Sequence, residues 1–357
     1  MTASPAISVV MAAYNGGALI EETIASVLAQ TFADFELVVV DDCSTDDTLA
    51  RLRAIADPRV RVIESAANGG PVVARNTAFT AVRGAYIVGL DQDDLCHPDR
   101  FAAQKAWLDN HPECVLVASA VDLIEQGVVR PESGERARMP QATSPALLAW
   151  RLWFGNPLVW SSVMVRAEAV RRLDVFERTD RLFAEDFDFY RRIAAHGTIA
   201  RIDRPLLTYR IHPGGASQRY TARMVESATA VLAEPYAALF GDAASGSARL
   251  ALTHFTGGAA VPDLITLHRL NLVLARVHAR AMAAIAPSDD EHGAIMAEYA
   301  RLWWQMADAT VRSGSLPRVV VSACCPKELG ARHPRPLRAA SSALIGAARA
   351  LRARWCA

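Results

Sequence analysis

Three carboxylates stand within four residues at the end of an apolar segment. Residues 85–90 look like a strand and lead into Asp91, Asp93 and Asp94. In an extended backbone Asp91 and Asp93 project to the same side, and like charges this close repel unless a cation lies between them. Carboxylate oxygens suit Mg²⁺ or Mn²⁺, which commonly bind together with phosphates. The run therefore points to a nucleotide-diphosphate substrate, and an Asp-rich turn after a strand is the open alternative.

The segments before Asp91 alternate between two periodicities. Apolar runs predict buried strands and 3.6-residue spacing predicts helices between them. The strands are expected at 7–12, 35–40, 60–63 and 85–90, and the helices at 19–28, 45–55 and 72–82, with Ser44 or Thr45 capping the second helix. Four strands alternating with three helices predict an α/β fold with an open, Rossmann-like, mostly parallel sheet and flanking helices.

Polar residues follow the expected strands at the end where ligands gather in such sheets. These clusters are Tyr14–Asn15, Asp41–Asp42, Asn68–Gly70 and Asp91–Asp94. Four clusters that converge on one edge are harder to explain as turns than any single one. A dinucleotide-binding oxidoreductase could share the sheet, but the loop after the first strand lacks the Gly-x-Gly-x-x-Gly pattern.

The second half of the sheet domain is less regular. Further strands are expected at 114–124, 158–165, 198–202 and 206–211, a helix is expected from Pro98 and another from Glu185 to Gly197, and residues 126–144 read as a loop. Beyond residue 216 alanine, leucine and arginine recur at helical spacing, with breaks near 241–247, 257–262 and 286–288. We expect a catalytic domain over 1–215 and an α-helical C-terminal region over 216–357.

Composition narrows the class of protein. The 357 residues are 52% hydrophobic and 21% charged, with a formal net charge of zero. A neutral chain argues against nucleic acid as a partner. No apolar run approaches the ~20 residues of a membrane span, and no secretory signal is evident. The six cysteines lack zinc-like spacing, so we expect reduced thiols in a cytoplasmic protein.

The C-terminal tail is basic. From Pro317 onward it holds eight Arg or Lys residues against one acid, Glu328. Leu337, Leu344, Ala348, Leu351 and Trp355 would share one stripe of a helix. Such a helix can lie on an anionic membrane surface, which would place the protein on the inner face of the membrane. A solvated or dimer-facing helix is the equally open alternative.

The chain resembles family 2 glycosyltransferases of the GT-A fold over about residues 6–215. Six blocks in the family's order carry the resemblance: Met11–Asn15; Val40–Asp46; Asn68–Gly70 with Ala74–Asn76; Leu90–Asp94; Glu185–Asp188; and Tyr209–His212. Cys43 and Ala78 depart from the pattern, since the family often has glycine there. The resemblance implies transfer of a sugar from a nucleotide-sugar to an acceptor hydroxyl, with inversion at the anomeric carbon.

The resemblance also implies a metal and a base. Asp93 would ligate Mn²⁺ or Mg²⁺ directly, and Asp91 would face the ribose or a metal-bound water. His212 would complete the metal shell or touch the diphosphate, unless it is structural. Asp186 matches the position of the general base that accepts the proton of the attacking hydroxyl, with Glu185 and Asp188 as fallback candidates.

The donor site would surround the nucleotide. Asp41 follows the second strand, at the position where members of the family contact the nucleobase. A carboxylate there can accept a hydrogen bond from uracil N3–H. A UDP-sugar is favoured, and a dTDP-sugar would satisfy the same contact. Tyr14 could stack on the base, and Arg75 could pair with a phosphate or be an exposed helix residue. The predicted donor-binding set is Tyr14, Asn15, Asp41, Asp42, Gly70, Arg75, Asn76, Asp91 and Glu185.

The expected acceptor is a glycan or a lipid-linked glycan. Two other classes remain open: a nucleotidyltransferase of related fold, and a catalytically silent protein that binds nucleotide-sugars. The first would carry a Gly-rich phosphate loop with a basic residue near the first strand, and none is present. The second would have lost Asp93 or Asp186, and both are retained.

Overall fold

The computed structural model describes residues 4–132, 139–212, 215, 219–329, 340–347 and 349. The chain forms two compact units, which are treated separately below. Unit 1 holds residues 1–148 and 157–224, and unit 2 holds residues 149–156 and 225–357. The assignment of residues 1–215 as the catalytic domain stays a prediction.

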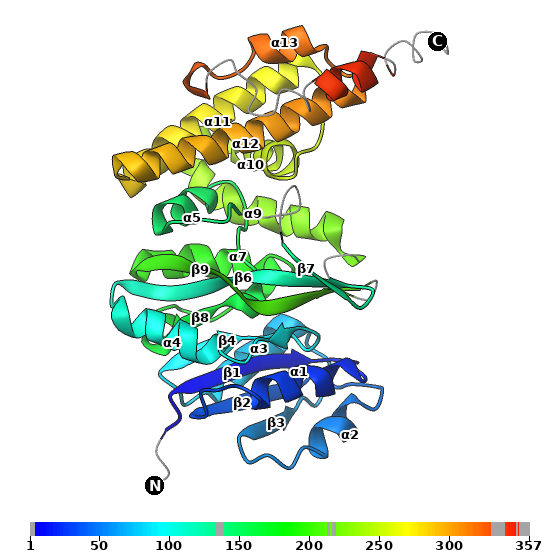
Figure 1. Ribbon diagram of the computed structural model, residues 1–357, viewed down its shortest axis with the longest axis vertical. Coiled ribbons are helices and arrows are strands. Elements are labelled where there is room, and N and C mark those ends of the chain that lie inside the picture. Colours follow the sequence, from blue (N-terminus) through cyan, green and yellow to red (C-terminus); the bar gives the residue numbers. More distant parts are fainter. Residues whose placement is uncertain are drawn as a thin grey trace. The chain divides into compact units, whose positions relative to one another are not determined.

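Unit 1 is built on one mixed sheet (Figure 1). In the described residues the strand order is β3-β2-β1-β4-β8-β6-β9-β5, and β7 pairs with β6. The strands are β1 Ile7–Ala13, β2 Phe35–Asp41, β3 Val60–Glu64, β4 Tyr86–Gly89, β5 Leu95–Cys96, β6 Cys114–Glu125, β7 Val128–Pro131, β8 Met164–Arg166 and β9 Thr198–Ile211. The first four in this order run parallel, and β8 is antiparallel to both of its neighbours. The predicted α/β sheet fold is confirmed.

The parallel half fixes where the polar clusters lie. The register pairs Ala13 of β1 with Asp41 of β2 and Val10 of β1 with Gly89 of β4. Every residue of β2 is buried, as expected for a strand covered on both faces. The flanking helices are α1 Leu19–Leu28, α2 Thr48–Arg53, α3 Pro71–Thr80 and α4 Arg100–Asn110. The carboxyl ends of β1, β2 and β4 therefore meet at one edge.

The expected strand over 158–165 is wrong for most of its length. A 3₁₀ turn occupies Trp160–Ser162, and only Met164–Arg166 are strand. Two serine side chains bond backbone groups here in place of strand pairing. Ser162 Oγ donates to the Val159 carbonyl, and Ser161 Oγ accepts from the Asp91 N–H. The Trp160 ring packs on Gly89, where a Cβ would lie 2.6 Å from Trp160 Cε2. The apolar pattern belongs to a buried loop.

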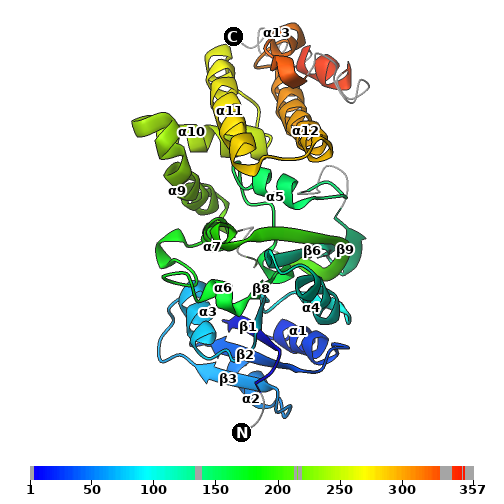
Figure 2. The same cartoon turned by 90° about the vertical axis from the view of Figure 1, so that its left-hand side faces the viewer.

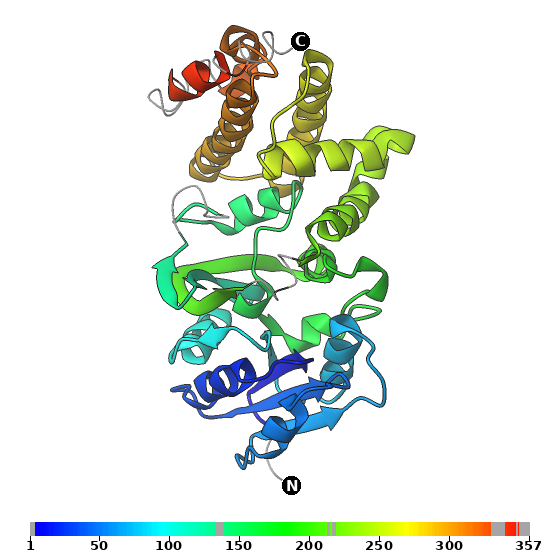
Figure 3. The ribbon, with the colours of Figure 1, turned by 90° about the vertical axis from the view of Figure 1, so that its right-hand side faces the viewer.

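Other boundaries differ for local reasons. Strands predicted at 198–202 and 206–211 form one strand, β9, whose pairing with β6 shifts register where Pro205 opposes Ala120. Helix α2 begins at Thr48, later than predicted, and neither Ser44 nor Thr45 caps it. The Asp46 carboxylate instead accepts a hydrogen bond from the Thr48 N–H. The predicted loop 126–144 contains β7, and residues 133–138 lie outside the described part. Figure 3 shows β6 and β9 side by side.

Three short helices complete the segment after β7. They are α5 Pro145–Arg151, α6 Ala167–Val170 and α7 Glu185–Ile193. Helix α7 continues as a 3₁₀ turn over Ala194–His196 before Gly197, so the predicted helix from Glu185 to Gly197 is confirmed in position. Phe79 of α3 stacks on Phe176 at 4.8 Å, and Phe176 meets Phe189 of α7 edge-on at 5.2 Å. These rings join α3, the segment before α7, and α7.

Unit 2 is helical, as predicted. Its helices are α9 Thr221–Phe240, α10 Ala244–Leu250, α11 Leu264–Ile285, α12 Asp289–Ser313 and α13 Arg318–Ala323, and a π-helical turn spans Ala251–Thr256. Helices α11 and α12 form a hairpin (Figure 2), joined by the Trp303 Nε1 to Asn271 Oδ1 hydrogen bond of 3.0 Å. The predicted break at 241–247 is shorter, because α10 begins at Ala244. Within the described residues, none of the helices combines the length and apolarity of a membrane span.

Cys43 offers a test of backbone strain beside the sheet edge. It is exposed and has φ 61°, a left-handed conformation that glycine adopts freely. Because a side chain there costs energy, Cys43→Gly should raise the free energy of unfolding by about 1 kcal/mol, as measured by urea denaturation. Gly127→Ala, at φ 79° with nothing near its added Cβ, should lower it. A Cys43→Gly variant no more stable than the parent would contradict the expected strain.

Candidate active site

The acidic turn after β4 is held by the end of β9. His212 Nε2 lies 2.7 Å from Asp93 Oδ2. The Arg210 side chain donates through Nε to the Asp93 carbonyl, and its backbone N–H donates to Asp94 Oδ1, both at 2.9 Å. The fold thus brings together Asp93 and His212, two predicted metal ligands that lie 119 residues apart in the sequence.

Asp91 and Asp94 differ in exposure. The Asp91 side chain is 39% exposed, yet desolvation raises its pKa to about 6; Arg75 opposes the rise, and repulsion from Asp93 and Glu185 adds to it. Asp94 is buried, and desolvation followed by repulsion from Asp93 and Asp91 raises its pKa well above the usual value. Its Oδ2 atom has no hydrogen-bond partner among the described residues. Burial and mutual repulsion thus disfavour the charged forms of Asp91 and Asp94.

The two acids at the carboxyl end of β2 have different surroundings. Asp42 accepts from the N–H groups of Gly69 and Gly70, at 2.9 and 2.7 Å, so both of its oxygens order the loop before α3. Asp41 is buried and accepts from the Ser44 N–H through Oδ2. Its Oδ1 atom is buried and lacks a partner among the described residues. Asp41 therefore has one acceptor oxygen that no described residue uses.

Tyr14 and Asn15 order the loop after β1. The Gln92 side-chain amide pairs with the backbone of Tyr14 in both directions, at 2.9 and 3.0 Å. Asn15 accepts from the Thr45 N–H through Oδ1 and donates its own N–H to Ser44 Oγ. The Tyr14 ring is left 44% exposed beside the edge, where it could stack on a flat ligand.

Arg75 is buried among three carboxylates and is not the exposed helix arginine of the alternative interpretation. It is 5% exposed. Nε lies 3.0 and 2.8 Å from the two oxygens of Glu177, Nη2 pairs with Glu185, and Nη1 lies 3.6 Å from Asp91. The Trp160 ring lies 5.3 Å from its Cζ. The predicted contact of Arg75 with a phosphate stays a prediction.

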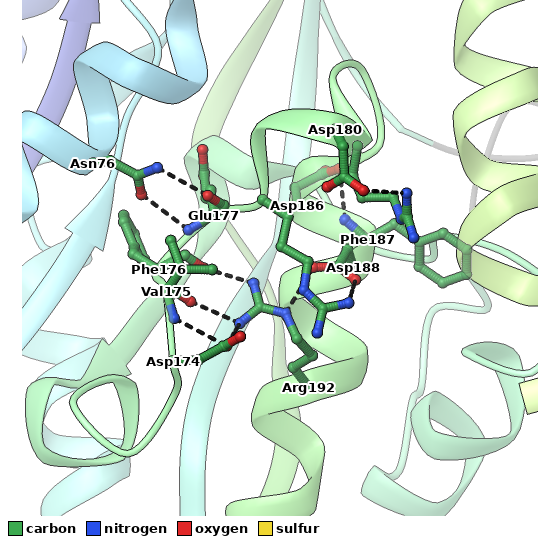
Figure 4. Close-up of polar contacts among 12 residues, drawn as sticks. Asn76, Asp174, Val175, Phe176, Glu177, Asp180, Asp186, Phe187, Asp188 and Arg192 are labelled. Atoms are coloured by element: carbon green, nitrogen blue, oxygen red, sulfur yellow. Dashed lines mark hydrogen bonds and ion pairs between the residues drawn. The ribbon is translucent and has the colours of Figure 1, made fainter. Parts of the chain in front are cut away.

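Glu177 is a site residue that sequence reasoning missed. It is fully buried, and desolvation raises its pKa to about 8 against the lowering by Arg75, with Glu185 and Asp186 adding repulsion. The Asn76 amide bonds its carbonyl and its N–H, at 2.8 and 3.0 Å (Figure 4). A lone glutamate in an irregular segment has no spacing to predict such burial.

The acids at the start of α7 separate into buried and accessible groups. Asp188 is buried and pairs with Arg192 at 2.7 Å (Figure 4). It also lies 3.4 Å from Arg178. Glu185 is buried against Arg75. Asp186 is partly exposed, and its Oδ1 accepts from the Phe187 N–H at 2.7 Å. Of these acids, Asp186 is the one that an acceptor hydroxyl could reach.

The residues fit a divalent cation that is completed by a ligand. Among the described residues, no three His, Cys, Asp or Glu side chains lie close enough to form a metal cluster. The Asp93–His212 pair offers an oxygen and a nitrogen at one point. Mg²⁺ and Mn²⁺ often take only one or two protein ligands and fill the remaining positions with water and phosphate oxygens.

Comparison with known proteins establishes the family. Residues 8–169 match the sequence profile of glycosyl transferase family 2. The chain is 31% identical over 203 residues to the putative glycosyltransferase EpsE of Bacillus subtilis, covering 55% of this chain and 69% of EpsE. The chain belongs to glycosyltransferase family 2, as the sequence blocks predicted.

Two further relatives have more specific names. The β-1,3-glucosyltransferase WfaP of Escherichia coli, named for UDP-Glc and a GlcNAc-diphosphoundecaprenol acceptor, is 29% identical over 212 residues, which are 59% of this chain and 79% of WfaP. The succinoglycan biosynthesis protein ExoO of Rhizobium meliloti is 40% identical over 152 residues, which are 42% of this chain and 44% of ExoO. The chain thus spans less than half of ExoO.

Solved structures establish the GT-A fold. S. aureus TarS 1-349 in complex with UDP-GlcNAc superposes with a TM-score of 0.52 at 17% identity, covering 91% of this chain and 88% of that chain. The mannosyltransferase PcManGT of Pyrobaculum calidifontis, in complex with GDP-Man and Mn²⁺, gives 0.53 at 22% identity, with 92% and 88% covered. At these identities the likeness establishes the fold alone.

The burial of Glu177 makes a prediction about pH. Its pKa of about 8 exceeds the 4.5 of an exposed glutamate. At pH values between these two, the folded chain keeps a proton that the unfolded chain has lost. Stability should therefore fall as pH rises through this window, by at most about 1.4 kcal/mol per pH unit. Urea unfolding of the wild type between pH 6.5 and 8.5, above the pKa of about 6 for Asp91, should show the decline.

The matched variant is Glu177→Gln, which cannot titrate. Its free energy of unfolding should depend less on pH than that of the wild type over the same range. Arg75, Glu185 and Asp186 surround the position in both proteins, so their contributions remain in the comparison. Equal slopes for the two proteins would show that Glu177 does not titrate in this window.

Proposed function

We propose that this protein is an inverting, metal-dependent hexosyltransferase that moves a sugar from a UDP-sugar to an acceptor hydroxyl. The observation that carries the proposal is the 2.7 Å contact between Asp93 and His212 at the sheet edge. Asp91 and the unpartnered Asp41 oxygen lie at the carboxyl ends of β4 and β2, at the same edge. A metal-bound diphosphate and its nucleobase could thus be bound together.

The nucleobase is assigned to Asp41. A buried carboxylate oxygen without a partner is costly, and uracil N3–H would satisfy it as a donor. Tyr14, exposed beside the edge, would stack on the base, while Asn15, Asp42 and Gly70 hold the surrounding loops. The names of TarS and WfaP, which include UDP-GlcNAc and UDP-Glc, support a UDP-sugar, although the PcManGT complex holds GDP-Man.

The cation would be Mn²⁺ or Mg²⁺, held by Asp93 and His212 with Asp91 nearby. When bound, such an ion supplies Lewis-acid stabilisation of the charge on the leaving diphosphate. The protein's own contribution is to keep these side chains in place. Arg210 fixes the Asp93–Asp94 turn, and Ser161 fixes the backbone at Asp91.

Asp186 is assigned as the general base. The acceptor oxygen forms a bond to the anomeric carbon, the bond from that carbon to the diphosphate oxygen breaks, and the hydroxyl proton passes to the Asp186 carboxylate. Inversion by this single displacement needs no protein nucleophile. Asp188 and Glu185 are buried, whereas Asp186 is partly exposed, which favours Asp186 over both fallback candidates.

The acceptor is proposed to be a glycan or a lipid-linked glycan in polysaccharide, glycan or glycolipid synthesis. The names of ExoO and WfaP support this class. The idea that the basic tail binds a membrane surface stays a prediction, because most of its apolar stripe lies outside the described residues. A nucleotidyltransferase or a silent binding protein would be recognised by the absence of sugar transfer in a donor screen with Mn²⁺.

Replacing the proposed base should separate binding from chemistry. Asp186→Asn removes the proton acceptor and keeps the side-chain shape, so turnover should fall by roughly 10²–10⁴-fold. The affinity for UDP with Mn²⁺, measured by calorimetry, should change less than about twofold, because the base contacts the acceptor and not the nucleotide.

The control for this variant is Asp180→Asn. Asp180 lies six residues earlier, is 66% exposed and pairs with Arg181. Its replacement should leave both turnover and UDP affinity unchanged. If Asp186→Asn turns over a donor as fast as the wild type, another group accepts the proton.

Replacing the proposed nucleobase acceptor should alter base selectivity. Wild-type protein should bind UDP at least about tenfold more tightly than CDP, since cytosine lacks an N3–H and a hydrogen bond to a charged group contributes roughly 1.5–3 kcal/mol. Asp41→Ala should bind UDP and CDP with similar, weaker affinity in the presence of Mn²⁺. A variant that keeps the preference for UDP would place uracil recognition elsewhere.

A further inference from the structure

Glu177 lies in the segment between α6 and α7, outside the six sequence blocks. Its carboxylate is fully buried and faces Arg75, with Nε 3.0 and 2.8 Å from its two oxygens. A buried carboxylate needs a compensating partner wherever it lies. Here the partner is an arginine whose other two nitrogens face the donor edge and the helix of the proposed base.

The guanidinium is a rigid, planar fork. When Glu177 holds Nε, the plane and direction of the fork are set. Nη2 then pairs with Glu185, and Nη1 points to Asp91 at 3.6 Å. Since Glu185 directly precedes Asp186, the fork joins the first turn of α7 to the carboxylate at the end of β4.

The segment that carries Glu177 is itself fixed to both helices. Asn76 of α3 bonds the backbone N–H and carbonyl of Glu177, and Arg192 of α7 donates to the carbonyls of Val175 and Phe176 (Figure 4). Glu177 is therefore held from its backbone as well as its side chain. Such preorganisation is what keeps a functional group in one orientation.

We propose that Glu177 is a positioning residue of the transfer reaction, which acts through Arg75 to fix the start of α7 relative to the donor carboxylate Asp91. The proposal rests on the proposed function. The base must lie opposite the leaving group at the moment of attack, and displacement by about 1 Å can cost 10²-fold in rate. Without Glu177 the fork can rotate, and α7 loses its link to Asp91.

The test is Glu177→Ala in the full-length protein, with sugar transfer followed at saturating UDP-sugar and Mn²⁺. We expect kcat to fall about 100-fold, while the affinity for UDP with Mn²⁺ stays within about threefold, because Asp41 and Asp93 are untouched. Glu177→Gln keeps the side-chain length and one acceptor for Nε, so it should recover about tenfold of the lost rate.

Glu36→Ala is the matched control. Glu36 is also buried and pairs with two arginines, Arg61 at 2.8 Å and Arg83 at 2.6 Å, but it stands near the start of β2, at the opposite edge of the sheet from Asp41. This variant should lose stability and keep kcat at a temperature where it is folded. Comparing Glu36→Ala with Glu177→Ala separates the effect of losing a buried ion pair from the effect of displacing the start of α7.

A second readout does not depend on activity. Amide hydrogen exchange over residues 185–190 should be faster in Glu177→Ala than in the wild type and unchanged in Glu36→Ala. If Glu177→Ala does not fold, the Gln variant carries the test, with an expected loss of about tenfold in kcat. Wild-type kcat in the variants that fold, or unchanged exchange over 185–190, would overturn the positioning role and leave the proposed function standing. A wild-type protein that transfers no sugar would overturn both.

Discussion

The site depends on one electrostatic constraint: carboxylates are gathered at the edge of a sheet, where water cannot fully solvate them. Arg75 is a single buried cation among Glu177, Glu185 and Asp91. One guanidinium cannot compensate three carboxyl groups, and Asp93 and Asp94 add two more in the turn after β4. Desolvation, together with repulsion between neighbouring acids, raises the pKa values of Glu177 and Asp91. We propose that a divalent cation bearing a diphosphate binds at this edge, beside Asp93 and His212.

The parallel strands create this constraint. Register places the ends of β1, β2 and β4 together, so each polar turn meets the next. The antiparallel strand β8 and the long pair β6–β9 then return the chain to that edge, where Arg210 and His212 reach Asp94 and Asp93. The second half of the sheet supplies the groups that hold the acids in place. The family 2 glycosyltransferase fold is thus a way of bringing distant turns to one point.

Much of this arrangement could be predicted from the sequence, since it depends on local pattern. The apolar runs of β1 to β4 and the helical spacing between them gave correct elements, because buried parallel strands read as continuous apolar runs. The acids that follow those strands could be placed at the edge by the same logic. The Asp93–His212 contact agrees with the block Tyr209–His212, although no local rule would pair residues so far apart.

What could not be predicted depends on tertiary contacts. Trp160 reads as part of a strand, yet it packs on Gly89, and the Ser161 hydroxyl caps the Asp91 backbone. The sequence alone predicts an exposed helix arginine at Arg75 almost as well as a phosphate ligand, and only the folded chain surrounds it with acids. Glu177 carries no periodic signal at all. Each of these residues is placed by partners far along the chain, which single-sequence patterns do not encode.

The most direct measurement is a crystal structure with UDP and Mn²⁺, with data collected at the manganese absorption edge. The account predicts an anomalous peak bound by Asp93 and His212, with the pyrophosphate on the same ion and uracil against Asp41. UDP bound without manganese density beside Asp93, or a nucleotide bound away from the edge formed by β1, β2 and β4, would contradict it.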